Sequence, residues 1–547
     1  MLPDAASYDD VVRRFRWEVP EAYNIGVDVC DKWAERTPSR PAIIEIRDDG
    51  PDRTLTFADL RALSNQTANL LAGHGIARGD RVGILLPQTA ETAYSHIAVY
   101  KLGAIAIPLF TLFGDEALAF RLGNAGARAV ITSREGAAKL AAIRAELPAL
   151  EYVVCIDGRA AGALDFHAGR AAQSETFDPV PTLADDPALI IYTSGTTGPP
   201  KGALHAHRVL LGHLPGVEIS HDFFPKEGDR IWTPADWAWI GGLLDVLMPA
   251  LHHGVTVIAK RFTKFTGEAA FDLIHRYQVR NAFIPPTALK MMRGVPDAET
   301  RWPLRMRTVA SGGETLGAEL LDWGRRVLGV TINEFYGQTE CNMIVSSCGA
   351  IMAPRPGIMG RPVPGHGVEV VGEDGRPCAD GELGMIAVRR GSPVMFLGYW
   401  GNEAATRGKF LGDWLITGDQ GIRDAEGWLR FVGRDDDVIT SSGYRIGPGE
   451  IEDCLIRHPA VQMAAVVGKP DPERTEIVKA YVVLKDGVAS SDALAAELAG
   501  HVKTRLAAHE YPREVTFVDA LPMTTTGKII RRALRERAAA ETGLAGR

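Results

Sequence analysis

The chain is poor in cysteine and has no excess of positive charge. Its 547 residues include only 6 cysteines, which lie scattered and form no C-x-x-C pair. Secreted disulfide frameworks are denser, so we expect a reducing, cytoplasmic environment. Lys and Arg number 60 against 68 Asp and Glu, which gives a formal net charge of −8. This balance disfavours general binding to nucleic acid or to an anionic membrane surface.

Long apolar runs and targeting signals are also missing from the sequence. The longest apolar stretch, residues 239–251, is interrupted by Asp245 and is shorter than the roughly 18 residues that a membrane span needs. The first residues are acidic and lack the basic and apolar regions of a signal or transit peptide. The last residues, Leu-Ala-Gly-Arg, carry no peroxisomal Ser-Lys-Leu. We therefore expect no integral membrane segment.

The arrangement of apolar runs predicts the fold class. Hydrophobic residues make up 46% of the chain and charged residues 23%, which is typical of a globular protein. Over the first part of the chain, short apolar runs such as 81–86, 129–132 and 188–192 alternate with amphipathic stretches, which predicts parallel α/β layers. From residue 362 onward, shorter β-like runs separated by turn signals predict a small β subdomain. The last part of the chain has its own α+β pattern.

The most informative segment is a glycine- and hydroxyl-rich loop, Tyr192-Thr-Ser-Gly-Thr-Thr-Gly-Pro-Pro-Lys-Gly202. Glycines let the backbone turn tightly and point N–H groups at an anion, while the hydroxyls add donors and Lys201 adds a positive charge. The loop is not a Walker A motif, because Gly202 and Ala203 follow the lysine where that motif needs Ser or Thr. Its chemistry indicates a phosphate-binding loop; an ordinary turn before a helix is the alternative.

Further segments follow this loop in a fixed order. They are Ser311-Gly-Gly-Glu-Thr-Leu, Asn333-Glu-Phe-Tyr-Gly-Gln-Thr-Glu340, Asp413-Trp-Leu-Ile-Thr-Gly-Asp419, Gly433-Arg-Asp-Asp-Asp-Val-Ile-Thr-Ser-Ser-Gly-Tyr-Arg-Ile-Gly-Pro-Gly-Glu-Ile-Glu452 and Pro522-Met-Thr-Thr-Thr-Gly-Lys528. Together with the loop, they resemble the motifs of the adenylate-forming (AMP-binding) superfamily, which includes acyl-CoA synthetases, luciferases and peptide-synthetase adenylation domains. The segment Ser441-Ser-Gly-Tyr-Arg-Ile-Gly-Pro448 is most similar to the corresponding segment of the medium-chain acyl-CoA synthetases.

The resemblance implies an adenylate-forming fold of class α/β. We expect a large N-terminal domain of layered α/β sheets over residues 1–434, with a small β subdomain over about 362–434. A small, mobile α+β domain over residues 435–547 would carry the catalytic lysine. The implied reaction has two halves: a carboxylate attacks the α-phosphate of ATP to give acyl-AMP and pyrophosphate, and coenzyme A then takes the acyl group. ATP, Mg²⁺ and coenzyme A are the implied cofactors and co-substrates.

The resemblance also assigns residues to the first half-reaction. Lys528 would place its ammonium between the carboxylate and the α-phosphate, Glu340 would bind Mg²⁺, and Thr196 would donate to phosphate oxygens. Taken singly, such carboxylates and lysines are ordinary surface groups, and only their joint order supports the roles. The residues expected to bind ATP are Thr193, Ser194, Gly195, Thr196, Thr197, Gly198, Lys201, Gly313, Glu314, Glu334, Phe335, Tyr336, Gly337, Gln338, Thr339, Asp419, Arg434 and Lys528.

For the second half-reaction, the resemblance makes Asp436 the pivot of the C-terminal domain. The acidic run Asp435-Asp-Asp437 could otherwise be a solvated turn, or a metal cluster, although it lacks the spacing and late Glu of an EF-hand. The family also implies that a lysine acyltransferase and deacylase act on Lys528. The residues expected to bind coenzyme A are Ser442, Gly443, Tyr444, Arg445, Arg474 and Lys503.

The acyl pocket is the least determined part of the site. In acetate-specific relatives a tryptophan closes this pocket, whereas this chain has Gly337 there, so we expect space for an acid larger than acetate. Trp237 stands where relatives have a smaller residue, so a branched or aromatic acid is as plausible as a medium-chain one. No arginine is obviously placed to pair a distal carboxylate, which favours a monocarboxylic acid. The residues expected to line the pocket are Trp237, Trp239, Gly241, Gly312 and Gly337.

Other functions remain open at this point. An adenylating enzyme that loads a carrier protein, a luciferase-like oxygenase and a non-catalytic acyl- or nucleotide-binding regulator would share many of these motifs. The pairs His205/His207 and His252/His253 lack a third ligand at zinc spacing and are expected to be structural. A G-x-S-x-G motif is absent, so a serine hydrolase has no support.

Overall fold

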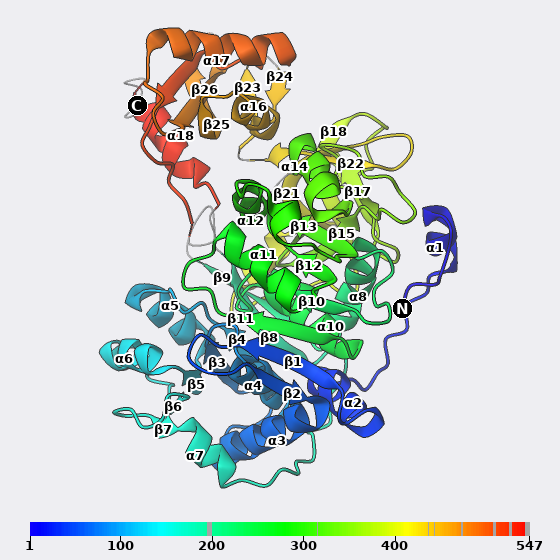
Figure 1. Cartoon of the computed structure of the whole chain (residues 1–547), viewed down its shortest axis with the longest axis vertical. Coiled ribbons are helices and arrows are strands. Elements are labelled where there is room, and N and C mark those ends of the chain that lie inside the picture. The colour runs from blue at the N-terminus through cyan, green and yellow to red at the C-terminus, as the bar shows by residue number, and fades with distance from the viewer. Residues whose placement is uncertain are drawn as a thin grey trace. The chain divides into compact units, whose positions relative to one another are not determined.

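The computed structural model describes residues 1–193, 200–313, 316–435, 437–441, 444–471, 474–506, 510–524 and 528–541. Within them, the strands form four sheets with helices packed on their faces (Figure 1). The predicted α/β class is confirmed. None of the described helices combines the length and apolar character that crossing a bilayer requires.

The largest sheet has nine strands in the order β16-β15-β14-β13-β12-β10-β11-β1-β2. Neighbouring strands from β1 to β14 run parallel, while β2, β15 and β16 are antiparallel additions at the two edges. The strands are β1 (Pro41–Ile46), β2 (Arg53–Thr56), β10 (Arg230–Trp232), β11 (Thr256–Lys260), β12 (Asn281–Phe283), β13 (Thr308–Gly312), β14 (Ile332–Gln338), β15 (Cys341–Ser346) and β16 (Arg361–Pro362).

A second, eight-stranded sheet has the order β19-β9-β8-β4-β3-β5-β6-β7. Its central strands, β4 and β5, are buried at every residue, as parallel strands covered on both faces are. The strands are β3 (Arg81–Leu85), β4 (Ile105–Pro108), β5 (Ala129–Thr132), β6 (Tyr152–Cys155), β7 (Leu164–Asp165), β8 (Pro187–Thr193), β9 (Lys201–Ala206) and β19 (Gly398–Tyr399).

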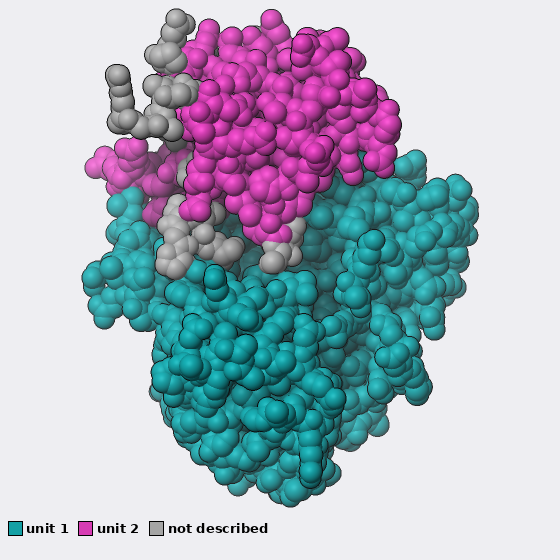
Figure 2. Space-filling model, turned by 90° about the vertical axis from the view of Figure 1, so that its left-hand side faces the viewer, with its two compact units in different colours: residues 1–368, 388–415 teal, residues 369–387, 416–547 magenta. Residues whose placement is uncertain are grey.

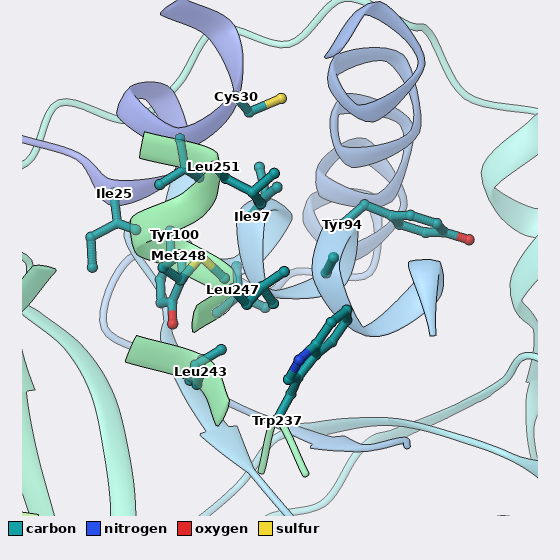
Figure 3. Packing of buried hydrophobic residues seen from close by; sticks show 14 of the residues in the cluster. Ile25, Cys30, Tyr94, Ile97, Tyr100, Trp237, Leu243, Leu247, Met248 and Leu251 are labelled. Carbon is teal, nitrogen blue, oxygen red and sulfur yellow. The ribbon is translucent and has the colours of Figure 1, made fainter. Parts of the chain in front are cut away.

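The main core joins these two sheets through buried helices. Helix α4 (Ala90–Lys101) is buried along its whole length, and one apolar cluster contains residues of both sheets together with this helix. Figure 3 shows side chains of α4 beside those of the π-helical turn η3 (Leu243–Leu247) and of α10 (Met248–His252). Neighbouring α3 (Phe57–Gly73) begins with a capping box between Thr56 and Asp59.

Among the remaining helices of this region, α8 (Val209–Ser220) is also buried along its whole length and contributes to the main core. The others are α1 (Tyr8–Arg14), η1 (Val27–Asp31), α2 (Lys32–Arg36), α5 (Asp115–Ala125), α6 (Arg134–Ala142), η2 (Arg144–Glu146), α7 (Phe166–Ala171), α9 (Ile240–Gly242), α11 (Gly267–Arg276), α12 (Pro286–Arg293), α13 (Ala298–Arg301), α14 (Ala318–Trp323), η4 (Gly324–Leu328) and α15 (Glu403–Gly408).

A five-stranded sheet, in which β20 and β22 pair antiparallel with β21, occupies the region expected to be a β subdomain. Its order is β17-β18-β21-β20, with β22 also paired to β21. The chain divides into two compact units, residues 1–368 with 388–415 and residues 369–387 with 416–547 (Figure 2). The boundary expected after residue 434 stays a prediction. The strands are β17 (Val368–Val371), β18 (Leu383–Arg389), β20 (Phe410–Leu411), β21 (Trp414–Arg423) and β22 (Leu429–Arg434).

The C-terminal part has the expected α+β character. Its sheet has the order β24-β23-β26-β25, with β27 parallel to β26. Apolar residues of the sheet pack against its helices in a core of their own. The elements are β23 (Ile439–Ser441), β24 (Tyr444–Ile446), α16 (Pro448–Ile456), β25 (Val461–Asp471), β26 (Thr475–Leu484), α17 (Asp492–Arg505), β27 (Glu514–Phe517) and α18 (Arg531–Ala540).

Candidate active site

The predicted phosphate loop joins two paired strands. Strands β8 and β9 are antiparallel, and Thr193 at the end of β8 stands opposite Lys201 at the start of β9. The hydroxyl of Thr193 donates to the carbonyl of Lys201 at 3.4 Å. The pairing therefore fixes both ends of the loop. The expected ligands Ser194, Gly195, Thr196, Thr197 and Gly198 lie outside the described residues.

Glu340, the expected Mg²⁺ ligand, is held from two sides. It lies with Thr339 in the tight connection between β14 and β15, where Gln338 pairs with Cys341. Its side chain is almost fully buried, and Oε1 accepts a hydrogen bond from the hydroxyl of Tyr399. Its carbonyl accepts from the backbone N–H of Phe396 at 2.9 Å. The carboxylate is thus fixed in orientation before any ligand binds.

Tyr399 is a site residue that sequence reasoning missed. It lies on β19, whose pairing with β9 sets Tyr399 opposite Ala203, two residues after Lys201. The ammonium of Lys201 lies 5.3 Å from the centroid of the Tyr399 ring, a cation–π distance. One tyrosine therefore links the end of the phosphate loop to the expected metal ligand. No motif marked it, because the contact depends on pairing between strands distant in sequence.

The expected adenine-side segments meet at the ends of two parallel strands. Strands β13 and β14 pair with Ser311 opposite Glu334 and Gly312 opposite Phe335. A Cβ on Gly312 would come within 2.7 Å of the Phe335 carbonyl oxygen, so only glycine allows this approach. Gly313 follows with a φ of 95°, which also favours glycine. Glu314 lies outside the described residues, and Tyr336 continues β14.

The expected ribose ligands are cross-strand neighbours in the second compact unit. Asp419 on β21 pairs with Arg434 on β22, and Oδ1 of the carboxylate lies 3.1 Å from Nη1 of the arginine. Asp419 is almost fully buried, and its backbone N–H donates to the hydroxyl of Thr417 at 3.1 Å. The arginine therefore balances a buried negative charge, and the carboxylate supplies acceptors of the kind that ribose hydroxyls need.

Lys528 is exposed, and residues 525–527 before it lie outside the described residues. Its backbone N–H donates to the hydroxyl of Thr524 at 3.1 Å, and the N–H of Thr524 donates to the carbonyl of Lys528 at 2.8 Å. Met523 and Ile529 form an antiparallel bridge just outside this pair. The backbone at Thr524 and Lys528 is thus anchored while the lysine side chain faces solvent.

The coenzyme A and hinge assignments stay predictions. Asp436, Ser442 and Gly443 lie outside the described residues, and only the backbone of Tyr444 and Arg445 is described, within β24. The structure places the other two expected residues in ordinary surface positions. Arg474 lies in the turn after β25, where its N–H donates to Asp471 at 2.9 Å, and the ammonium of Lys503 lies 5.2 Å from the Tyr511 ring.

The residues expected to line the acyl pocket are closely packed; Trp237 and Gly312 are buried, and the other three are half-buried. Trp237 is completely buried in the main core, and Figure 3 shows it among apolar side chains of η3 and α10. Trp239 packs on Phe110 and Phe113, with ring centroids 5.6 and 6.2 Å away. A Cβ on Gly241 would lie 2.8 Å from the Phe283 ring. Aromatic side chains therefore dominate this region.

The expectation that Gly337 leaves space for the acyl chain stays a prediction, but the structure gives the glycine a second reason. A Cβ at this position would lie 2.4 Å from the backbone nitrogen of Met343 and 2.6 Å from Oδ1 of Asn342. The missing side chain therefore accommodates the returning strand β15. Its role in the acyl pocket stays a prediction.

These motifs extend over two regions that match known families. Residues 30–400 match the AMP-binding enzyme family, and residues 450–528 match the AMP-binding enzyme C-terminal domain. The chain belongs to the AMP-binding enzyme family. The phosphate loop and Glu340 lie inside the first match and Lys528 at the end of the second, whereas the pair Asp419 and Arg434 lies between them.

Similar proteins cover almost the whole chain. The acetyl-coenzyme A synthetase of Bacillus subtilis (strain 168) is 33% identical over 97% of this chain and 94% of its own length. The mitochondrial acyl-coenzyme A synthetase ACSM4 of Rattus norvegicus is 34% identical over 96% of this chain and 92% of its own. A crystal structure of the anthranilate CoA ligase AuaEII in complex with anthranoyl-AMP has a TM-score of 0.87 at 31% identity, covering 96% of this chain and 99% of that one. Similarity to these AMP-binding enzymes supports the assignment of AMP-forming acyl-CoA synthesis to this chain. The reaction passes through an acyl-adenylate and uses ATP, Mg²⁺ and coenzyme A.

Three of the four histidines in the two histidine pairs of this AMP-binding enzyme have polar partners, and His205 is completely buried. Nδ1 of His207 accepts from the N–H of Ile25 at 3.2 Å, Nδ1 of His252 lies 2.6 Å from Asp28, and Nε2 of His253 lies 3.2 Å from Glu218. Burial lowers the pKa of His205 to about 3, so this ring is neutral near pH 7. Over the residues that the structure describes, no three His, Cys, Asp or Glu side chains group as metal ligands.

Proposed function

We propose that this AMP-binding enzyme activates a monocarboxylic acid larger than acetate, medium-chain, branched or aromatic, and transfers its acyl group to coenzyme A. The observation that supports the adenylating site best is the arrangement of Lys201, Tyr399 and Glu340 at the end of the phosphate loop. The ammonium of Lys201 can attract the negatively charged triphosphate, and the oriented carboxylate of Glu340 can bind the Mg²⁺ that accompanies it. The second step uses the thiol of coenzyme A as the nucleophile.

Glu340 is the residue that would hold Mg²⁺. A buried carboxylate whose orientation is set by a hydroxyl donor offers the hard oxygen ligand that this ion prefers. When bound, Mg²⁺ neutralises charge on the phosphate oxygens. The protein's own groups position the substrates: Lys201 attracts the phosphates, and Asp419 with Arg434 binds the ribose. Lys528 brings a positive charge to the attacking carboxylate and the α-phosphate.

The size of the acid is inferred from the surroundings of the pocket. No side chain extends from position 337, because β15 occupies the direction of its Cβ. The residues expected to line the pocket include Trp237 and Trp239, and the Phe283 ring lies against Gly241. Flat apolar surfaces of this kind suit hydrocarbon chains or rings. One similar structure holds an aromatic acyl-adenylate, anthranoyl-AMP.

We also propose where the enzyme is located and how Lys528 is regulated. A cytoplasmic location agrees with six free cysteines, five of them buried. The exposed ammonium of Lys528 is open to a lysine acyltransferase, which would remove its charge and switch off adenylation. An unchanged intact mass after deacylase treatment of protein from its native cells would contradict this regulation.

The experiment is a steady-state assay of pyrophosphate release with ATP, Mg²⁺ and a panel of acids. The panel runs from acetate through butyrate, hexanoate and octanoate to benzoate, with and without coenzyme A. Turnover that requires coenzyme A and is fastest above acetate supports the proposal. Fastest turnover of acetate would overturn the proposed acid class. Turnover that does not depend on coenzyme A would indicate carrier loading, and no turnover on any acid would indicate a binding protein.

A further inference from the structure

A buried carboxyl group lies next to the expected acyl pocket with one oxygen unpaired. Asp245 is 2% exposed and belongs to the π-helical turn η3, one turn after Gly241. Its Oδ1 accepts a hydrogen bond from the amide of Asn342 at 2.6 Å. Its Oδ2 is fully shielded from solvent and has no hydrogen-bond partner among the residues that the structure describes. An unpaired buried polar group costs free energy that a suitable ligand recovers.

This carboxyl group connects the glycines expected to line the pocket. Oδ2 lies 3.5 Å from the position of a Cβ on Gly241, so it faces the side on which that glycine has no side chain. Asn342 is the residue that crowds Gly337, and its amide holds Oδ1. Phe283, which limits Gly241, packs on the Phe335 ring with centroids 5.2 Å apart. The polar pair Asp245 and Asn342 is thus surrounded by pocket residues on β12, β14 and α9.

The charge state of this pair favours a neutral ligand. Burial raises the pKa of Asp245 well above its ordinary value and so favours the protonated, neutral form of the carboxyl group. Nε2 of His213 lies 3.8 Å from Oδ1, but burial lowers the pKa of this histidine to about 4, so the ring is uncharged. A protonated carboxyl group can both donate and accept a hydrogen bond. A hydroxyl or an amino substituent can likewise both donate and accept a hydrogen bond, so either group can pair with this carboxyl group.

We propose that Asp245 and Asn342 form a polar subsite of the acyl pocket that selects a carboxylic acid bearing a hydroxyl or amino substituent. This inference rests on the proposed function, because it needs the acyl pocket to lie beside Gly241. The indole N–H of Trp237, buried and without a hydrogen-bond partner among the described residues, is a second donor on the same segment. An acid that lacks the substituent leaves these groups unpaired, and sites built this way discriminate strongly.

The test compares matched acids on the wild-type enzyme and on Asp245→Leu. Benzoate is compared with each hydroxybenzoate and aminobenzoate isomer, and hexanoate with 6-hydroxyhexanoate, by kcat/KM in the pyrophosphate assay. We expect the wild type to prefer one substituted acid over its parent by about tenfold or more. Asp245→Leu should abolish that preference while the KM for ATP stays the same. Asp245→Asn, which keeps the shape and a donor, should retain part of it.

Two further variants make the result decisive. Asn342→Leu removes the partner of Oδ1 and should reduce the same preference, which keeps the test open if Asp245→Leu fails to fold. Glu218→Gln alters another buried acid, paired with His253, and should leave the preference unchanged. Activity with equal kcat/KM for substituted and parent acids, or the same ratio in wild type and Asp245→Leu, would overturn the subsite alone. No turnover of any acid would overturn the proposed function as well.

Discussion

The hydroxyl of Tyr399 donates a hydrogen bond to the carboxylate of Glu340, while the same ring lies beneath the ammonium of Lys201. The first contact orients the expected Mg²⁺ ligand, and the second fixes the cation at the end of the phosphate loop. Strand pairing between β19 and β9 brings the three together. The site is therefore organised by a residue that takes no direct part in either half-reaction.

Removing this hydroxyl should weaken the response to Mg²⁺. A hydrogen bond to a charged group contributes about 1.5–3 kcal/mol, so Tyr399→Phe should raise the Mg²⁺ concentration for half-maximal pyrophosphate release about tenfold or more. Tyr100→Phe is the control, because that hydroxyl lies 3.2 Å from His96 in the main core. A Mg²⁺ dependence that is the same in Tyr399→Phe and wild type would contradict the positioning role.

The ribose assignment predicts a change in one kinetic constant. Asp419→Asn keeps the shape of the side chain but loses the charge that attracts the ribose hydroxyls, so the KM for ATP should rise about tenfold. The KM for the acid should not change. Glu369→Gln is the control in the same β sheet, since this carboxylate pairs with Arg423 at 3.6 Å. A parallel rise of both KM values in Asp419→Asn would indicate general damage instead.

Lys528 should matter for adenylation only. Loss of its ammonium removes charge stabilisation from the first transition state, which costs roughly a hundredfold in rate by comparison with loss of one oxyanion donor. Lys528→Ala should therefore release pyrophosphate about a hundredfold more slowly yet still convert supplied acyl-AMP to acyl-CoA. Lys485→Ala, at an exposed lysine of the same unit, should affect neither step. Equal loss in both steps would count against this division of labour.

A hinge variant should give the opposite pattern. Asp437, next to the expected pivot, pairs with Arg535 and Arg531 of α18, so the chain after the pivot is tied to the C-terminal domain. Proline fixes φ and would restrict rotation at residue 436. Asp436→Pro should slow thioester formation more than adenylation, measured as separate half-reactions. A rate of thioester formation equal to that of the wild type would remove Asp436 as the pivot.

Buried histidines should make folding stability fall in mild acid. Burial lowers the pKa of His96 to about 3, against an ordinary value of about 6.5. As the pH falls below 6.5, His96 becomes protonated in the unfolded chain but stays neutral in the folded chain. The free energy of unfolding therefore falls between pH 6.5 and about pH 3. At pH 5 this one group costs about 2 kcal/mol. The urea midpoint of His96→Leu should fall less between pH 7 and pH 5 than that of the wild type; an equal fall would contradict the assignment.

Motif order predicted much of the site from sequence alone. The structure brings together Thr193 and Lys201, at the two ends of the phosphate loop, and the cross-strand pair Asp419 and Arg434. In both cases the partners are close in sequence, so one hairpin determines their approach. Short-range pairing of this kind is readable from the order of strands and turns.

Contacts that depend on long-range packing could not be predicted. Tyr399 and Glu340 are separated by 59 positions, and Asp245 and Asn342 by 97. Nothing local marks these pairs, because they follow from the pairing of β19 with β9 and from the position of η3 beside β15. The close return of β15, which requires a glycine at position 337, is another long-range contact that the local sequence does not show.

The most direct test of the account is a single turnover without coenzyme A. Enzyme in excess is mixed with ATP, Mg²⁺ and the preferred acid, quenched within seconds and analysed by mass spectrometry for acyl-AMP. Coenzyme A is then added to a second portion before quenching. We expect acyl-AMP and pyrophosphate in equal amounts at first, replaced by acyl-CoA and AMP after the addition. ADP and phosphate, or an acyl-AMP that coenzyme A does not consume, would contradict the account.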